Sequence, residues 1–327
     1  MAGLLFIFFP VSLYLGPVEG DLTRMGYWAE RDFGLNKSQR PVSIINDYNP
    51  PAQSDIMVLG DSFSIDTYWQ SELSAILNKS IQTYEYTRSG CVDNWVQWLL
   101  NIKHATVKLV IMEVIERQFM TFSRIIPCRT FIPQPVHSAH SRTSLLTKMD
   151  LPENRRVYSL SPQYLYHTLR NTIRMTRTNS LLVSGIVVNV PLKRSDLFSN
   201  RRSDRMLHLD EHDAKSRWSV SDMQQSITNL RQLQAQFRAK NIEFVLVVVP
   251  DKSNVYKQYM ENGAPLPEVF DVFQETFTAG LSAVNLLTYF RGLLPEIMDL
   301  YRPNDTHLSQ EGYRLMARVL AENMKLP

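Results

Sequence analysis

The stretch that decides the fold runs from Asp55 to Ser64 and reads DIMVLGDSFS. Its first part, DIMVLG, is a short apolar run that ends in glycine, which predicts a buried strand of a parallel sheet. The segment from Tyr68 to Leu77 (YWQSELSAIL) follows with helical spacing. A strand, a tight turn and a helix in this order are typical of the start of an α/β domain.

Further strands and helices alternate on both sides of this stretch. Strands are expected at 81–87, 107–114, 242–249 and 283–288, and helices at 94–103, 163–177, 221–239, 267–279 and 309–324. The run IEFVLVVV at 242–249 has the composition of a central strand. This alternation predicts an α/β fold with a central parallel sheet that helices cover on both faces.

The N-terminal residues 1–20 contain an apolar run without charge, from Ala2 to Val18 (AGLLFIFFPVSLYLGPV). Its length is at the lower limit for a membrane span, it lacks a basic start, and Pro10 interrupts it. An uncleaved anchor, an export signal and a buried hairpin remain open. We favour an anchor or export signal, which would place the protein in the periplasm or elsewhere outside the cytoplasm, membrane-anchored.

The rest of the chain divides into a linker and one catalytic domain. Residues 21–54 are polar and contain several glycines and prolines, so we expect a linker that wraps onto the domain at 55–327. Within that domain, the regular alternation lapses at about 118–218, which indicates a mid-chain insertion, a lid or a substrate platform. A strand pair at 181–190 is expected inside it.

The composition excludes several classes of protein. The chain has 327 residues, of which 44% are hydrophobic, so it can bury an ordinary core. The net charge of +3, from 35 basic and 32 acidic residues, makes no case for nucleic acid as a partner. Cys91 and Cys128 form no metal-binding motif, and they are either one disulfide or two free thiols. We expect no cofactor and no metal.

Ser62 lies where a parallel α/β fold places its ligands. Such folds bind ligands beyond the carboxyl ends of the strands, and Gly60-Asp61-Ser62 directly follows the first expected strand. Gly60 permits a tight turn, and the next helix would aim backbone N–H groups at Ser62, where they can stabilise an oxyanion. The alternative is that Asp61 and Ser62 only cap that helix.

A second motif, Asp305-Thr306-His307, lies just before the last expected helix. A serine hydroxyl becomes a good nucleophile when a histidine takes its proton, and a carboxylate keeps that histidine in the right tautomer. Two residues apart in a loop, Asp305 and His307 can converge on one site. Together with Ser62 they predict a catalytic Ser-His-Asp set.

The chain resembles the SGNH/GDSL hydrolase family in these two motifs, GDSFS near the start and DTHLSQEGY near the end. The resemblance implies a three-layer α/β/α fold, with Ser62 as nucleophile and its N–H in an oxyanion hole. The family places a second donor on a glycine after the second strand, which Gly90 matches. The usual GxND block after the third strand is missing.

In place of that block stands VIMEVIER, with Glu113, Glu116 and Arg117. This E-x-x-E-R pattern is similar to that of polysaccharide O-acetyltransferases of the AlgX/AlgJ type. Tyr68 matches the position of their active-site tyrosine, and the VPDK segment that contains Lys252 is similar to theirs. The resemblance implies oxyanion or substrate roles for Gly90, Tyr68, Glu113 and Arg117. In those proteins the DxH block precedes the serine block, whereas here it follows.

Each of these secondary residues also has a simpler interpretation. Glu113 and Arg117 can form an ion pair at a strand end, and Tyr68 can pack on the first helix. Lys252 is expected to order the loop after its strand. Asp210, His212 and Asp213 could suggest a metal site, but solvated charge explains them better.

Three functions follow from these motifs. The first is an O-acyltransferase, specifically an O-acetyltransferase, that acts on an extracytoplasmic polysaccharide through an acyl-Ser62 enzyme. Its partners would be the polysaccharide acceptor, an acyl donor and a membrane-bound acyltransferase, with membrane association through the N-terminus. The second is a carbohydrate esterase or lipase-like hydrolase with the same residues. The third is a non-catalytic polysaccharide-binding subunit.

Overall fold

The computed structural model describes residues 2–44, 53–85, 98, 101, 106–123, 158–210, 215, 218–261, 280–294 and 296–324. The expected helix at 267–279, and all but two residues of the one at 94–103, lie outside these residues. So do Gly90, Cys91 and Cys128, whose roles and pairing stay predictions.

The centre of the protein is a parallel sheet of five strands in the order β2-β1-β3-β7-β8. The strands are β1 (Ile56–Gly60), β2 (Ile81–Glu85), β3 (Leu109–Ile115), β7 (Glu243–Val249) and β8 (Ala283–Asn285). Every residue of β1 and β3 is buried, because helices cover a parallel sheet on both faces. The predicted α/β fold with a parallel sheet is confirmed.

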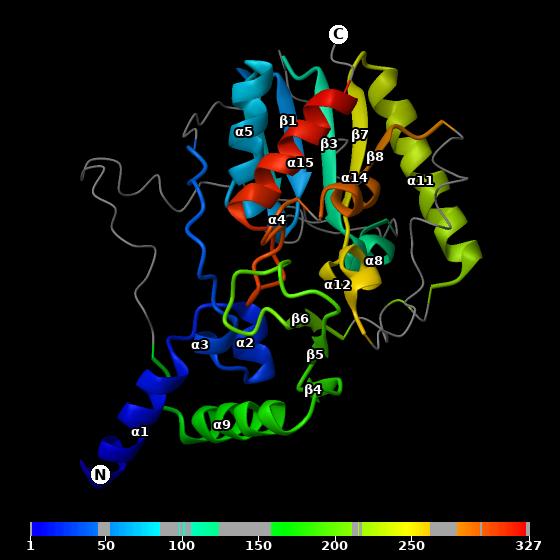
Figure 1. The fold of residues 1–327 in the computed structure, drawn as a ribbon. Coiled ribbons are helices and arrows are strands. Elements are labelled where there is room, and N and C mark those ends of the chain that lie inside the picture. Colours follow the sequence, from blue (N-terminus) through cyan, green and yellow to red (C-terminus); the bar gives the residue numbers. More distant parts are fainter. Residues whose placement is uncertain are drawn as a thin grey trace, which may run out of the picture.

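Two helical layers enclose this sheet (Figure 1). Helices α5 (Tyr68–Leu77) and α15 (Gln310–Asn323) pack together on one face, and α11 (Val220–Arg238) packs on β7 with α8 (Phe119–Ser123) on the other. The expected strand at 283–288 ends early, because the Asn285 side chain accepts from the N–H groups of Leu287 and Thr288 and caps α14 (Leu286–Leu293). The arrangement is three-layered, as the SGNH resemblance implied.

The strand order has a switch point at the carboxyl ends of β1 and β3, where an open parallel sheet is expected to have a crevice. From β1 the chain first adds β2 on one side and later adds β3 on the other side of β1. Connections that leave a sheet in opposite directions open a binding site between the two strands. The short helix α4 (Ser62–Ile65) follows β1 here, and the 3-10 turn η2 (Glu116–Gln118) follows β3.

A smaller lobe lies beyond these carboxyl ends (Figure 1). It contains α2 (Asp21–Gly26), α3 (Glu30–Phe33), α9 (Pro162–Arg177) and an antiparallel sheet of β4 (Leu182–Ser184), β5 (Val187–Pro191) and β6 (Arg205–Leu209). Its own core consists of Leu22, Trp28, Phe33, Met175, Leu182, Val187 and Leu207. The strand pair expected at 181–190 is confirmed as β4 and β5. At the start of the expected linker, residues 21–33 contribute α2 and α3 to this lobe, and Leu22, Trp28 and Phe33 are buried in it.

The chain begins with α1 (Ala2–Leu15), a helix that continues through Pro10 and packs beside α9. Leu15, Ala29 and Leu165 form a small buried cluster there. Among the residues that the structure describes, no helix has both the length and the apolar character needed to cross a membrane. The roles of residues 1–20 as an anchor or export signal stay predictions.

Candidate active site

Ser62 is the first residue of α4, directly after the carboxyl end of β1, and is exposed. Asp61 before it is buried and caps this helix, since its Oδ1 accepts from the Phe63 N–H at 2.9 Å. The other oxygen of Asp61 accepts from the Ile115 N–H at 2.7 Å and so joins the turn to the end of β3. Both interpretations of the motif therefore hold in part: Asp61 is the cap, and Ser62 is presented to solvent.

The structure brings His307 and Asp305 to Ser62, as the sequence predicted. The Nε2 atom of His307 lies 3.0 Å from Ser62 Oγ, and its Nδ1 atom lies 2.7 Å from Asp305 Oδ1. The same carboxylate oxygen accepts from the His307 backbone N–H at 2.9 Å. The Phe63 ring packs on the imidazole with a centroid distance of 4.6 Å. This is the geometry of a nucleophile, a base and a carboxylate that orients the base.

The electrostatics of this set favour a histidine that gains a proton readily. Burial alone would lower the pKa of His307, but the hydrogen bond and charge of Asp305, and then the charge of Asp21, raise it above its ordinary value. Burial would raise the pKa of Asp305, but the hydrogen bond and charge of His307 hold it well below its usual range. Asp305 therefore stays ionised beside the imidazole of His307.

Glu113 lies behind the nucleophile turn. Its side chain is completely buried, and its Oε2 accepts from the Asp61 N–H at 3.1 Å and from Ser64 Oγ at 2.6 Å. Burial and the charge of the nearby Asp61 raise the pKa of Glu113 well above its usual value. In this position Glu113 supports the turn from inside; contact with an oxyanion or a substrate stays a prediction.

Arg117 belongs to a buried group of charges at the ends of β3 and β7. Its Nη1 donates to Asp251 Oδ1 at 2.7 Å. Lys215, completely buried, pairs with Asp251 at 2.7 Å and with Glu116 at 3.0 Å. The structure thus gives Glu113 and Arg117 different partners from the ion pair that we considered. Arg117 also lowers the pKa of His307 by its charge, which places it near the site.

Lys252 orders a loop, as expected, but the loop is the one that carries the Asp-His pair. Its Nζ donates to the carbonyl oxygens of Arg302, Pro303 and Asp305 at 2.7, 3.0 and 3.3 Å. Burial lowers the pKa of Lys252 to about 7, while the charges of Asp21, Asp305 and Asp299 act in the opposite direction. A lysine with three carbonyl acceptors fixes the backbone of this loop.

Asp21 is a site residue that the sequence did not reveal. Its backbone N–H donates to Asp305 Oδ2 at 3.2 Å, and its carboxylate accepts from the N–H and the hydroxyl of Thr306. Burial and the charge of Asp305 raise the pKa of Asp21. No spacing rule links positions 21 and 305, so only the fold could bring them together.

The neighbouring residues hold α2 against the same loop. The Asn304 carbonyl accepts from the N–H groups of Leu22 and Thr23, and a Cβ on Gly20 would lie only 2.1 Å from that carbonyl oxygen. The buried carboxylate of Glu30 accepts from the Gly20 N–H at 3.3 Å and also from the Asn304 amide. Glycine at position 20 therefore allows the close approach of the two segments.

Two other residues of the predicted site are Tyr68 and Gly90. Tyr68 is 4% exposed and its ring packs on Tyr313 of α15, with a centroid distance of 5.4 Å. This burial agrees with the packing alternative, and a role toward substrate stays a prediction. Gly90, the proposed second oxyanion donor, lies outside the described residues.

One group of potential metal ligands occurs among the described residues. Ligand atoms of Asp21, Asp305 and His307 lie within 4.8 Å of one another. Hydrogen bonds already account for this approach, since the Asp305 carboxylate is shared by His307 and the Asp21 N–H. Of the residues that we considered for a metal, His212 and Asp213 lie outside the part of the chain that is described.

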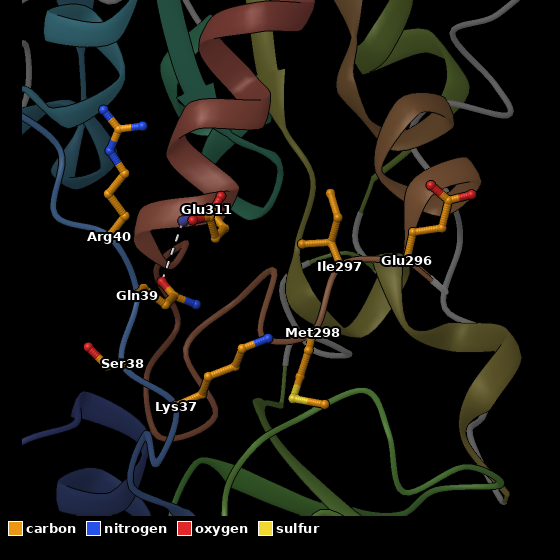
Figure 2. A pocket seen from close by; sticks show the side chains of 8 residues that line it. All are labelled: Lys37, Ser38, Gln39, Arg40, Glu296, Ile297, Met298 and Glu311. Atoms are coloured by element: carbon orange, nitrogen blue, oxygen red, sulfur yellow. Dashed lines mark hydrogen bonds between the residues drawn. The ribbon is translucent and has the colours of Figure 1, made fainter.

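A cavity of about 260 Å³ lies close to the start of α15 (Figure 2). Lys37, Ser38, Gln39, Arg40, Glu296, Ile297, Met298 and Glu311 line it. The Glu311 N–H donates to the Gln39 side chain at 3.4 Å across one edge. None of the predicted site residues contributes to this lining, so the cavity is separate from the Ser62 site.

Comparison with known proteins gives a match to one family model, over part of the chain. Residues 203–327 match the model of the SGNH hydrolase-like domain, acetyltransferase AlgX. The searches of curated proteins and of solved structures found no match. The matched region contains Lys252, Asp305 and His307. Ser62 lies before its first residue, outside the match. The resemblance to AlgX-type SGNH domains is confirmed for the C-terminal part of the chain.

Proposed function

Starting from the AlgX-type, SGNH hydrolase-like character of residues 203–327, we propose that this protein is an O-acetyltransferase that uses Ser62 as its nucleophile. The observation that carries the proposal is the 3.0 Å approach of His307 Nε2 to Ser62 Oγ. Asp305 completes the set on the opposite side of the imidazole. The acceptor that we propose is a hydroxyl group of a polysaccharide outside the cytoplasm.

The first half-reaction loads the serine. Ser62 Oγ attacks the carbonyl carbon of the acyl donor while its proton passes to His307 Nε2. The resulting imidazolium gives that proton to the leaving group as its bond to the acyl carbon breaks. Asp305, held ionised, stabilises the imidazolium. The Ser62 N–H, in the first turn of α4 and without an acceptor from within that helix, is the nearest candidate donor to the oxyanion.

The second half-reaction passes the acyl group to the acceptor. A sugar hydroxyl gives its proton to His307 Nε2 and attacks the acyl carbon, and Ser62 Oγ leaves and recovers the proton. Transfer succeeds when the hydroxyl reacts faster than water, so shielding of the acyl-enzyme favours it. The lobe of α2, α9 and β4–β6 lies beyond the strand ends and can contribute to this shielding (Figure 1).

A carbohydrate esterase is the second candidate. Ser62 is exposed and the His307 side chain is 28% exposed, so water can reach the same position as a sugar hydroxyl. The chemistry is identical except for the final acceptor. The product that forms in the presence of an oligosaccharide distinguishes the two functions.

The test compares Ser62→Ala with the purified protein and a chromogenic acetyl ester. The wild type is expected to release the chromophore and gain the mass of one acetyl group, whereas Ser62→Ala loses both, with a rate lower by about a thousandfold or more. Ser221→Ala, at an exposed serine of α11, serves as control and keeps full activity. Full activity of Ser62→Ala would show that another group is the nucleophile.

An added oligosaccharide completes the test. Acetylated sugar in place of free acetate supports the transferase, and free acetate alone supports the esterase. For the location of the protein, we propose a membrane-associated position outside the cytoplasm with a membrane-bound acyltransferase as supplier of acetyl groups. The uncharged N-terminal helix α1 supports this part of the proposal.

A further inference from the structure

Helix α9 turns three of its apolar side chains toward solvent. Tyr166, Leu169 and Ile173 have exposed fractions of 64%, 37% and 41%. Their spacing of three and four residues places them on one face of the helix. A surface helix of a water-soluble protein normally buries such a face, so this arrangement needs an explanation.

The opposite face of α9 is buried. It contains the apolar Leu165 and Met175 together with polar side chains whose hydrogen bonds fix the helix. Thr168, Asn171 and Thr172 are buried against the lobe. The Asn171 amide donates to the carbonyl oxygens of Gly26 and Tyr27 at 3.2 and 3.0 Å and to Ser184 Oγ at 2.8 Å. Rotation of α9 to bury its apolar face would break these bonds. The exposed apolar face therefore belongs to the folded state.

The charges of α9 and of the hairpin that follows it in the chain all have one sign. Between Tyr158 and Ile186 the chain has no acidic residue and three arginines, Arg170, Arg174 and Arg177. Arg170 and Arg177 are exposed beside the apolar face, and Arg174 is partly exposed. Arginines that flank an apolar helix face are typical of helices that lie in a membrane interface, where the guanidinium groups reach anionic headgroups.

Two neighbouring elements extend the apolar surface. At the β4–β5 hairpin, Leu181, Val183 and Ile186 are 38%, 45% and 58% exposed. In α1, which packs beside α9 and has no charged residue, Phe9, Leu13 and Tyr14 are about half exposed. Figure 1 shows α1, α9 and β4 at one end of the molecule, far from the C-terminus.

We propose that the exposed face of α9 lies in the surface of a membrane that contains anionic lipids. Tyr166, Leu169 and Ile173 enter the boundary between headgroups and acyl chains, and the arginines contact the phosphates. A lipid surface fits better than a protein partner, because the uncharged α1 continues the same apolar end and the charged residues of α9 itself are all arginines. This inference concerns membrane docking and stands apart from the acyl transfer at Ser62.

Flotation of the full chain with vesicles tests the inference. One set of vesicles consists of phosphatidylcholine alone and the other also contains phosphatidylglycerol. The triple variant Tyr166→Ser/Leu169→Ser/Ile173→Ser is expected to bind the anionic vesicles at least about tenfold more weakly than the wild type. Val220→Ser, which changes a side chain of 57% exposure on α11, is the matched control and binds like the wild type.

A charge variant separates α9 from α1. Because α1 is uncharged, its insertion into a membrane would not distinguish the two kinds of vesicle. The double variant Arg170→Gln/Arg177→Gln, in contrast, should weaken binding to the anionic vesicles only. Added salt should have the same effect on the wild type. Thermal unfolding checks that each variant is folded. The inference is overturned if the triple variant binds like the wild type or if the wild type does not prefer anionic vesicles. It is also overturned if the wild type binds neither kind of vesicle; a protein partner would then be the better candidate for the exposed face of α9.

Discussion

Asp21 shows how a single residue far away in the sequence can control the base of the site. It lies 284 positions before Asp305, yet its backbone N–H donates to the Asp305 carboxylate. Its own carboxylate accepts from Thr306, the residue between Asp305 and His307. The charged groups that face His307 are Asp305, Asp21 and Arg117, with Asp61 beneath the nucleophile turn. Among them Asp21 is the one that α2 supplies.

Asp21→Asn is expected to change the pH dependence of acyl transfer. The variant keeps the backbone N–H but removes a negative charge that raises the pKa of His307, so that pKa falls. Since His307 must be neutral to accept the proton of Ser62, the acid limb of the kcat/KM profile moves to lower pH. At its optimum, kcat/KM falls about tenfold, which corresponds to about 1.4 kcal/mol of lost transition-state stabilisation.

A change of pH profile separates this role from simple support of the loop. Asp222→Asn at the start of α11 is the control and leaves the profile in place. If Asp21→Asn lowers kcat/KM without moving the acid limb, Asp21 supports the loop only. Titration of the His307 imidazole by NMR gives the same information even where no ester is turned over.

At the scale of elements, the turn from β1 into α4 depends on very close packing. A Cβ on Gly60 would lie 2.2 Å from Ser64 Oγ and 2.8 Å from Glu113 Oε2. Both atoms belong to the hydrogen bonds that hold the turn under Ser62. The glycine is thus required by its neighbours on β3 and α4, which the sequence motif alone does not reveal.

Gly60→Ala is therefore expected to lower both stability and activity. Overpacking should lower the free energy of unfolding by about 1–3 kcal/mol and displace Ser62 from His307. Gly292→Ala provides a matched control in α14, since a Cβ there meets nothing within 4 Å; helix propensity should raise stability by about 0.5–1 kcal/mol. Chemical denaturation and ester turnover of both variants check this, and wild-type behaviour of Gly60→Ala would contradict it.

At the scale of the whole molecule, buried charges join parts of the chain that are distant in sequence. Glu116 follows β3, Asp251 follows β7, and Lys215 comes from the segment after β6. Burial would raise the pKa of Asp251, but Lys215 and Arg117 lower it; for Glu116 burial outweighs the charge of Lys215 and raises the pKa. Removal of one partner from such a buried group strongly lowers the free energy of unfolding, because it leaves a buried charge without its counter-ion.

Lys215→Met is expected to lower the free energy of unfolding by about 3–5 kcal/mol, because two buried carboxylates lose their shared cation. The double variant Lys215→Met/Glu116→Gln should recover part of this loss, since Asp251 keeps Arg117. Urea denaturation of the wild type and the two variants measures both values. If Lys215→Met is as stable as the wild type, the network does not hold these segments together.

The sequence by itself determined the strand-turn-helix start, the parallel sheet and the three residues of the proposed catalytic set. These follow from local patterns: DIMVLG and IEFVLVVV have the composition of buried strands, and a parallel sheet brings the carboxyl ends of its strands to one edge. Ser62 and His307 lie close to such ends or to the last helix, so their meeting within 3.0 Å was predictable. The strand pair β4–β5 was also predictable from the local sequence pattern at 181–190.

Only the tertiary structure decided which residues support that set. Asp21, Glu30 and Lys252 act on the loop of Asp305 through contacts between segments that are far apart in sequence, and no periodicity encodes such contacts. The same holds for α9: its pattern predicts a helix, but its buried Asn171 and the bonds that it makes decide which face meets solvent. Local patterns specify elements, whereas the burial of polar groups depends on the partners that the whole fold supplies.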